Sequence, residues 1–476
     1  MQALVVLIFL TAYFDAFQVF ALSTMGITIS FLLRGVFILG FLKKTVWDGE
    51  RLQFSASPPI MLLGAFLFAA ALSSLNPLIQ TSAPMIIQFH KTFAHLTYIS
   101  AFALICGIYP IKPITWERVF KTWLLISIVV NSFAIYQIFA RIYDLPFAWI
   151  TFSNVSLISR HSGEQATELG QLSLKFGNFY RATSFFSEPS ALAAHNVTIF
   201  FIMLMPKFQG NGFIFKSSNL NWTILILCII TLFLTFSLTG LMGLALVLFV
   251  AIMSRLHKAL KPIIFWFIIG AAIIVVADRI VYPYYNISVL ELFYDRIAGI
   301  IQGGNNSSIG GESFFTRAHS GWVGIQIWLS SPITGFGLGC FYLFPGNDIK
   351  FPDIGIASLL AETGILGTIA FTAFFLSLFY FTYKYTEKGN SRLPIDKREK
   401  RVVGVIIYIV VILFQTNFIT SNQIVTSGMW MHMAPILSLL NYALFKSGYK
   451  RRELRLVNAP LKVRVEKALA AFRASR

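Results

Sequence analysis

The sequence predicts an all-α membrane protein that crosses the bilayer about twelve times. Its 476 residues are 56% hydrophobic and only 12% charged, which is more apolar surface than a soluble domain buries. Aromatic residues make up 16% of the chain, as is typical of lipid-facing helices and of the belts at membrane boundaries. The basic residues cluster in short loops between the hydrophobic runs.

Twelve apolar segments approach the roughly 20 residues that a helix needs to cross the bilayer core. They are residues 2–22, 24–42, 59–75, 91–109, 119–140, 188–206, 221–237, 239–254, 263–278, 354–383, 402–419 and 428–445. We expect residues 1–445 to form a single transmembrane domain that includes two long loops, 141–187 and 279–352. Residues 446–476 then form a basic cytoplasmic tail.

The alternate short loops carry the basic residues that predict the orientation of the chain. These residues include Lys43, Lys44, Lys112, Lys216, Arg255, Lys258, Lys397, Arg398, Lys400 and Arg401. Because cytoplasmic loops are enriched in Lys and Arg, these loops and both termini belong on the cytoplasmic side. Both long loops then face out, into a periplasm or its equivalent.

The net charge of +18 is explained by the same bias. Nucleic acid is not an expected partner, because the basic residues lie in loops between membrane segments. We expect the tail to lie against the anionic headgroups of membrane lipids, and a specific cytoplasmic partner is the alternative.

The first long loop ends in the run YRATSFFSEPSALAAH, which contains Arg181 and Glu188. Ser187, Glu188 and Pro189 are typical of a helix start, where Ser caps, Glu suits the positive end and Pro is tolerated. Glu188 is therefore either a helix-end charge or a carboxylate held at the membrane boundary beside Arg181. Arg181 itself is either a headgroup anchor or part of a binding site.

The second long loop has three parts. The apolar pattern of residues 285–302 predicts a helix that lies along the membrane interface. Residues 303–313 are rich in Gly and Asn, which predicts a flexible hinge. Residues 314–331 predict a second helix with Arg317 in its first turns. The glycines that follow, Gly335, Gly337 and Gly339, allow the backbone to approach a ligand closely.

These residues suit chemistry on a sugar diphosphate. An arginine neutralises a diphosphate leaving group with a fixed fork of donors and a permanent charge. Two arginines, Arg181 and Arg317, would stabilise that charge as the glycosidic bond breaks. An attacking hydroxyl also needs a base, for which the candidates are Asp353, Glu188, His319 and Glu362. No nucleotide-binding or zinc-hydrolase motif is present, and no metal site is expected.

Other charged residues have plainer interpretations. We interpret Arg141, Arg160 and Arg296 chiefly as headgroup anchors. His319 and Lys91 either line the substrate cavity or are polar residues of the interface. Asp15 and Arg34 are expected to pair with each other, the ordinary solution for charges within membrane segments, and substrate contact is the alternative.

Three runs of the chain carry a resemblance to a known family. The run RATSFFSEPSALA resembles the arginine motif that precedes a membrane helix in O-antigen polymerases and O-antigen ligases. The residues from Arg317 through Trp322 to PITGFG resemble their second outer-loop signature, and LAETGILG resembles the helix motif that follows. The resemblance implies a metal-independent, inverting membrane glycosyltransferase with the GT-C-type architecture, which uses polyprenyl-diphosphate donors and no cofactor.

The chain also departs from the ligase pattern. Ligases carry a His-Asn pair where this chain reads Phe351-Pro352-Asp353-Ile354, and an arginine where it reads Phe236-Ser237-Leu238-Thr239-Gly240. Both differences favour a polymerase that joins lipid-linked repeat units. Asp353 is the first choice of base, because it takes the register of the ligase histidine.

The expected activity is therefore polymerisation of undecaprenyl-diphosphate-linked oligosaccharide repeat units of a surface polysaccharide such as O-antigen. Arg181 and Arg317 would hold the donor diphosphate, and Asp353 or Glu188 would orient or deprotonate the acceptor. A chain-length-regulating co-polymerase is a candidate partner. The alternatives are a ligase that transfers glycan to lipid A core or protein, a flippase or other transporter of lipid-linked oligosaccharides, and a structural subunit.

Overall fold

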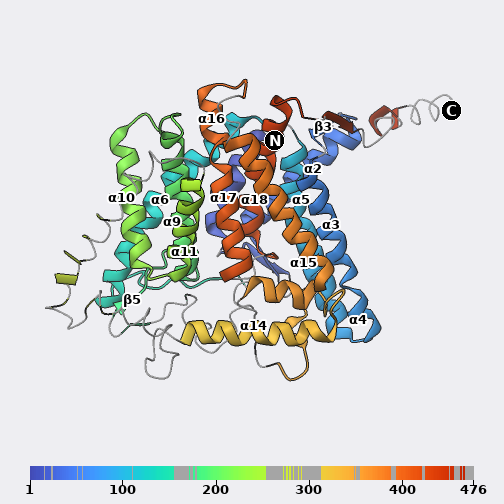
Figure 1. The fold of residues 1–476 in the computed structure, drawn as a ribbon, viewed down its shortest axis with the longest axis horizontal. Helices are drawn as coiled ribbons and strands as arrows, with labels where there is room; N and C mark the ends of the chain where they lie inside the picture. Colours follow the sequence, from blue (N-terminus) through green and yellow to red (C-terminus); the bar gives the residue numbers. More distant parts are fainter. Residues whose placement is uncertain are drawn as a thin grey trace.

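The protein is an all-α membrane protein, seen here in a computed structural model as a bundle of helices (Figure 1). The structure describes residues 1–15, 17–22, 25–50, 52–55, 57–109, 111–154, 171, 175–176, 179–253, 312–347, 349, 354–387, 393–420, 424–449, 451–454, 461–463 and 465–466, with scattered single residues between 268 and 291. The predicted ninth segment, 263–278, lies mostly outside the described residues.

Helices make up most of the described chain. They are α1 (Gln2–Thr11), α2 (Ile29–Leu42), α3 (Pro58–Leu72), α4 (Leu75–Ile79), α5 (Ala83–Ile108), α6 (Pro113–Ile142), α9 (Pro189–Phe208), α10 (Ser218–Leu234), α11 (Leu238–Met253), α14 (Glu312–Ser330), α15 (Gly355–Thr382), α16 (Lys397–Val403), α17 (Ile406–Gln415) and α18 (Ser427–Lys446). Within the described residues, six helical segments are long and apolar enough to cross a membrane. Such lengths match a hydrocarbon core about 30 Å thick.

The predicted segments 2–22 and 24–42 are wrong at the ends where they meet. Helix α1 continues only through a 3-10 turn, Ala12–Phe14, and the chain then forms a hairpin of β1 (Phe20–Leu22) and β2 (Met25–Ile27). Helix α2 begins after Thr28, whose hydroxyl accepts a hydrogen bond from the Phe31 N–H as an N-cap. Hydropathy alone did not reveal this hairpin, because its residues are themselves apolar.

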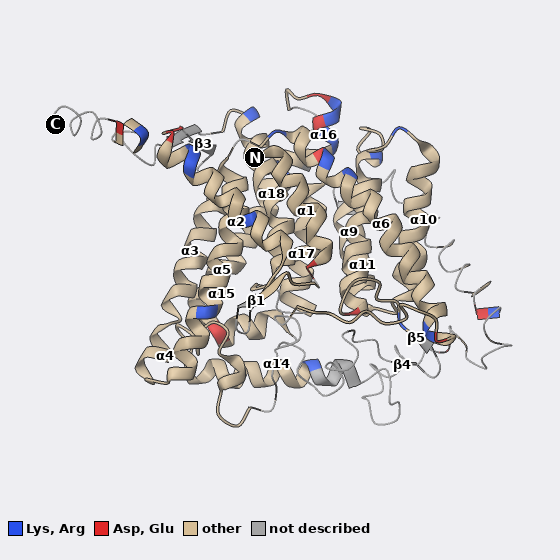
Figure 2. Cartoon of the chain, turned by 180° about the vertical axis from the view of Figure 1, so that it is seen from behind, with Lys and Arg blue, Asp and Glu red and all other residues tan. Residues whose placement is uncertain are grey.

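The expected cytoplasmic loops meet at one end of the bundle, which we call the α16 end. The Glu117 carboxylate is buried at the start of α6 and pairs with Lys121 at 2.9 Å and with Arg398 of α16. The Arg401 guanidinium donates to the Phe213 carbonyl at 2.6 Å. Figure 2 shows Lys and Arg residues, coloured blue, at this end of the bundle. The described loops that carry Glu117, Phe213 and Arg398 are therefore grouped in space, and the loop with Arg255 and Lys258 lies outside the described residues.

Part of the tail belongs to the same end of the bundle. Strand β6 (Arg451–Leu454) pairs antiparallel with β3 (Leu52–Ser55), which lies in the loop between α2 and α3. The tail is thus joined to another loop of the chain over these four residues, an interaction that its basic composition did not predict.

The opposite end of the bundle, which we call the α14 end, carries the described parts of both long loops (Figures 1 and 2). Helix α14 runs across this end rather than along the bundle. In the first loop, the Asn154 amide donates to the Asp15 carbonyl at 2.6 Å. In the second, the Phe336 carbonyl accepts a hydrogen bond from the Asn76 amide at 3.1 Å. Each loop is thus bound to a shorter turn of the same end.

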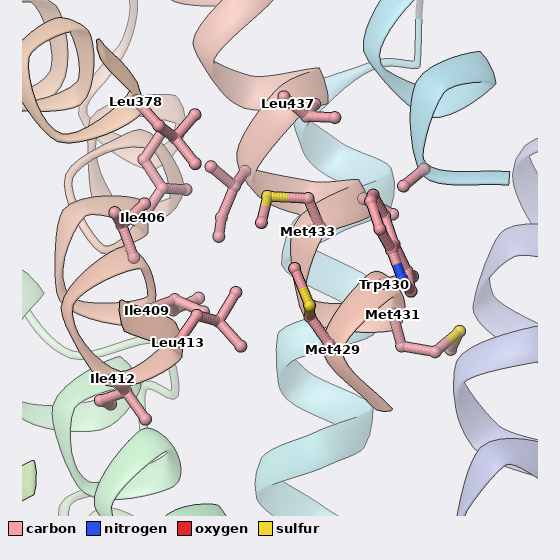
Figure 3. Packing of buried hydrophobic residues seen from close by; sticks show 14 of the residues in the cluster. Leu378, Ile406, Ile409, Ile412, Leu413, Met429, Trp430, Met431, Met433 and Leu437 are labelled. Atoms are coloured by element: carbon pink, nitrogen blue, oxygen red, sulfur yellow. The ribbon is translucent and has the colours of Figure 1, made fainter. Parts of the chain in front are cut away.

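The core lies between the long helices. Helix α15 packs along α3, and α18 packs along α5 and α17. Met429 and Met433 of α18 face Ile409 and Leu413 of α17 (Figure 3), whereas Leu437 packs on Gly107 of α5. Such dense apolar packing holds the helix ends, and the loops that they carry, in fixed relative positions.

Candidate functional site

Arg181 is buried at the α14 end and held by the turn between α10 and α11. Its side chain is 7% exposed, and Nε donates to the Thr235 carbonyl at 2.8 Å. The next residue repeats the contact, since the Ala182 N–H donates to the Leu234 carbonyl at 3.0 Å. A headgroup anchor would be exposed at the membrane surface, so this burial does not fit the simple anchor interpretation of Arg181.

Two residues around Arg181 have strained backbones. Ser184 has φ of +53° and Phe236 has φ of +47°, a left-handed conformation that costs a residue with a side chain roughly 1–2 kcal/mol. The Ser184 hydroxyl donates to the Val130 carbonyl of α6 at 2.6 Å. Strain of this kind persists only where surrounding contacts impose it, and it often clusters at functional sites.

Arg141 is not a headgroup anchor, so the prediction for this residue was wrong. Its side chain is 5% exposed at the end of α6 and stacks on Trp149, with the guanidinium carbon 4.1 Å from the ring centroid. Its nitrogens donate to the carbonyls of Ala148 at 2.9 Å and Arg181 at 2.7 Å, and to the Thr183 hydroxyl at 2.6 Å. Arg141 therefore fixes the backbone that presents Arg181.

Gln171 completes this network, although no pattern in the sequence indicated this role. Its buried amide oxygen accepts hydrogen bonds from Arg141 at 2.9 Å and from the Ile150 N–H at 3.2 Å. Its amide nitrogen donates to the carbonyls of Ser184 at 2.6 Å and Phe186 at 3.0 Å. One side chain thus ties together the beginning and the end of the first long loop.

Glu188, and not the predicted Ser187, stands at the N-cap position of α9, while Pro189 lies in the first turn as predicted. The cap is not made by its side chain. The carboxylate accepts a hydrogen bond from the Ser190 hydroxyl at 2.9 Å and remains partly exposed. A carboxylate held this way at a helix start is stabilised by the positive end of the helix and stays available to a ligand.

Arg317 and His319 lie on different faces of α14. Arg317 is half-buried and shares the helix face of Gly321 and Gly324, which pack on Ile354 and Ala357. No hydrogen bond or ion pair joins Arg317 to another residue in the described part of the chain. His319 is exposed on another face. Two residues along a helix differ by about 200° in direction, so these side chains do not converge.

The two remaining motif segments pack against each other through their backbones. The N–H groups of Phe336 and Gly337 donate to the carbonyls of Ala361 at 2.7 Å and Glu362 at 3.1 Å. In return, the Ile365 N–H donates to the Pro332 carbonyl at 2.9 Å. The runs PITGFG and LAETGILG therefore form one structural unit, which explains why they occur together in this chain.

The glycines of this unit approach protein, which differs from the predicted approach to a ligand. A Cβ on Gly335 would lie 2.5 Å from the Glu362 carbonyl, one on Gly337 would lie 2.7 Å from Pro77, and one on Gly339 would lie 2.3 Å from Thr92. At these three positions the backbone of the second loop therefore packs directly on α4, α5 and α15, because glycine has no side chain to separate them.

Glu362 and Cys340 are buried within the same unit. Glu362 is 7% exposed on α15, and its charge lies close enough to act on Cys340. Burial, followed by this neighbouring carboxylate, raises the pKa of the Cys340 thiol to about 12. Cys340 is therefore a neutral packing residue at physiological pH and not a nucleophile.

Asp15 and Arg34 pair with each other, as predicted. Arg34 Nη2 lies 3.4 Å from the Asp15 carboxylate, and Arg34 is 2% exposed. The hydroxyls of Thr28 and Ser30 each donate to the same carboxylate at 2.7 Å. These hydrogen bonds and the ion pair satisfy the Asp15 carboxylate. The pair joins the end of α1 to the start of α2.

The structure leaves several predicted residues apart from this site or undescribed. Lys91 is exposed on α5. Asp353, Arg160 and Arg296 lie outside the described residues, as do residues 303–311 of the predicted hinge 303–313 and nearly all of the expected interface helix 285–302. The last two residues of the predicted hinge are the first two of α14. The candidate residues that the structure describes are therefore Arg181 with its supporting network, Glu188, Arg317 and the packed motif unit.

Two buried polar residues of α9 were not singled out from the sequence. His195 packs against Tyr13 and Phe186, and neither its buried Nε2 nor the side-chain amide of Asn196 has a hydrogen-bond partner in the described part of the chain. Both lie two turns beyond Glu188. Their signal in the sequence is a His-Asn pair inside an apolar run.

No protein-family model matches this chain, and no curated protein matches it either. The family resemblance remains a prediction from the sequence motifs.

Proposed function

We propose that this protein is a membrane glycosyltransferase that polymerises undecaprenyl-diphosphate-linked oligosaccharide repeat units on the periplasmic face of a bacterial inner membrane. The proposal includes twelve spans, a GT-C-type architecture and cytoplasmic termini. The observation that carries it is the placement of both arginine-bearing loops at one end of a bundle of membrane-length helices. It is supported by the packing of the two later motifs as one unit.

The donor in this proposal is the growing glycan on its carrier diphosphate. Arg317 faces the bundle and has no acidic partner among the described residues. Its positive charge is therefore available to bind a phosphate. Arg181 is held rigidly by Thr235 and by the Arg141 network, which suits a residue that must meet developing charge without rearrangement. Together the two arginines would stabilise the leaving diphosphate.

The acceptor is the terminal sugar of a new lipid-linked unit. Its hydroxyl oxygen attacks the anomeric carbon of the donor with inversion, and the bond to the diphosphate oxygen breaks with its electron pair. A carboxylate takes the hydroxyl proton. Asp353 and Glu188 are the two candidates, and Glu188 is the one whose position at a helix start is described. His319 and Lys91 are then polar residues of the loop and helix surface.

The partners in this proposal are the donor and acceptor lipids, the surrounding membrane lipids and a chain-length-regulating co-polymerase. Neither nucleic acid nor a cofactor has a role. The charge of the Lys-rich and Arg-rich loops serves orientation in the membrane.

The test uses purified protein in liposomes with radiolabelled lipid-linked repeat units as the sole substrate. The wild type should produce a ladder of longer glycans. Arg317→Ala should lower the rate at least 100-fold, because a lost charge at a leaving group costs several kcal/mol. Arg118→Ala is the matched control, since Arg118 is exposed on α6 at the α16 end, and it should leave the rate unchanged.

Other outcomes separate the competing functions. Glycan transfer that requires added lipid A core or protein would show a ligase. Movement of substrate across the bilayer without new glycosidic bonds would show a transporter. Normal polymerisation by both Arg317→Ala and Arg181→Lys would refute the catalytic role of these arginines.

A further inference from the structure

Helix α14 has an exposed apolar stripe. Trp322 is 59% exposed, Ile325 37% and Leu329 64%. Their spacing of three and four residues places them on one face of the helix. Large apolar side chains gathered in this way are costly in water and indicate contact with another apolar surface.

The other side of α14 already has its partner within the bundle. Val323 and Ile327 are buried, and Gly324 brings the helix backbone close to Ala357 of α15, where an added Cβ would lie 3.1 Å from the Ala357 side chain. The stripe is therefore a second apolar face, separate from the one that holds α14 to the protein.

The stripe continues into the surface of a helix long enough to cross a membrane. Just beyond α14, Ile333 is 63% exposed, and its carbonyl accepts a hydrogen bond from the Leu366 N–H at 3.3 Å. Leu366 is 43% exposed and Ile369 60% on α15. Exposed apolar residues on a helix of this kind face lipid, so lipid reaches the end of the stripe.

Polar residues flank the stripe on one side. His319, Gln326 and Ser330 are exposed and lie along one edge of it. Helix α14 thus has an apolar stripe beside a polar edge, and it runs across the ends of the membrane helices (Figures 1 and 2). These are the features of a helix that lies at a bilayer surface.

We propose that α14 lies in the membrane interface, with Trp322, Ile325 and Leu329 among the acyl chains and Gln326 and Ser330 toward water. Its partner is the lipid bilayer itself. This placement rests on the membrane character of the protein and not on its proposed enzymatic activity. It has one consequence for the site: Arg317, on the bundle side of the same helix, is held near the depth of lipid phosphate groups.

The test is spin labelling of single introduced cysteines in proteoliposomes. Cysteine replaces Trp322, Ile325 or Leu329 on the stripe and Gln326 or Ser330 on the edge. Unsubstituted protein gives the background, because its own three cysteines are buried. The ratio of accessibility to oxygen over that to a water-soluble nickel chelate should be several-fold higher at the stripe positions than at the edge positions.

Two results would overturn the proposal. Equal access of the nickel chelate to all five positions would place the stripe in water. Stripe positions closed to both reagents would show that protein covers it, either a second copy or another segment of this chain. Photoreactive lipid added to the unsubstituted protein provides an independent measurement, in which the cross-links should map to Trp322, Ile325 and Leu329.

Discussion

At the scale of single residues, the first long loop shows how one arginine positions another. Arg141 donates to the Arg181 carbonyl and to Thr183, while Arg181 is bound through its own side chain to Thr235. Neither contact uses a carboxylate. The described contacts of these two arginines are therefore made to carbonyl and hydroxyl oxygens.

We predict that Arg141→Lys destabilises the protein. An ammonium group has no planar fork and cannot reach Ala148, Arg181 and Thr183 at once, so buried acceptors lose their donors. The expected loss is about 2–4 kcal/mol. It is measured as a fall in the temperature at which the buried cysteines become reactive to a fluorescent maleimide in detergent.

The control for this prediction is Arg118→Lys, because Arg118 is exposed on α6. That variant should unfold at the wild-type temperature. Equal unfolding temperatures for Arg141→Lys and the wild type would show that the network around Arg141 adds little stability.

Sequence patterns predicted the contacts of some residues and not those of others. The Asp15–Arg34 pair followed from the high cost of isolated charges in a membrane. The burial of Arg141 did not follow, because an arginine beside a membrane segment has the same local sequence whether it faces lipid headgroups or protein. The role of Gln171 could not be predicted either, because its hydrogen bonds reach residues that lie 13 to 34 positions away in the sequence.

At the scale of elements, the corner in α15 determines how the second loop is seated. Gly364 has φ of +64° and ψ of −167°, which divides α15 into a short first part and a long second part. A Cβ at this position would lie 2.3 Å from the Ile333 carbonyl oxygen. Only glycine combines that backbone conformation with so close an approach.

We predict that Gly364→Ala destabilises the protein by about 3 kcal/mol or more, through steric overlap and backbone strain together. Gly210→Ala separates the two effects, because Gly210 has φ of +78° with nothing within 4 Å of an added Cβ. That control should cost only the strain, about 1 kcal/mol. Thermal unfolding in detergent measures both variants, and similar losses would contradict the proposed overlap.

Helix boundaries were predicted well where apolar runs end in charge or proline. The predicted segments 354–383 and 428–445 differ from α15 and α18 by only one residue at each end. The β1–β2 hairpin and the transverse course of α14 were not predicted as such. Hydropathy reports how apolar a segment is, but it does not report the direction in which the segment runs.

At the scale of the whole molecule, charge counting grouped the loops correctly in space. Loops expected to share a side meet at the α16 end through Glu117, Arg398 and Arg401. Which side of the membrane each end faces is part of the proposal, and it can be measured directly.

We predict that a membrane-impermeant maleimide added to intact cells labels Ser330→Cys and not Lys216→Cys. Both positions are exposed, the first at the α14 end and the second in the loop between α9 and α10. After permeabilisation, both variants should be labelled to similar extents. Labelling of Lys216→Cys alone in intact cells would reverse the proposed orientation.

The pairing of β3 with β6 has a consequence for biosynthesis. Residues 52–55 leave the ribosome long before residues 451–454 are made. The growing chain therefore holds β3 without its partner strand, and the pair closes only after every intervening segment has been delivered to the membrane. The small sheet thus reports insertion of the segments between its two strands, and a chain released before residue 451 never acquires it.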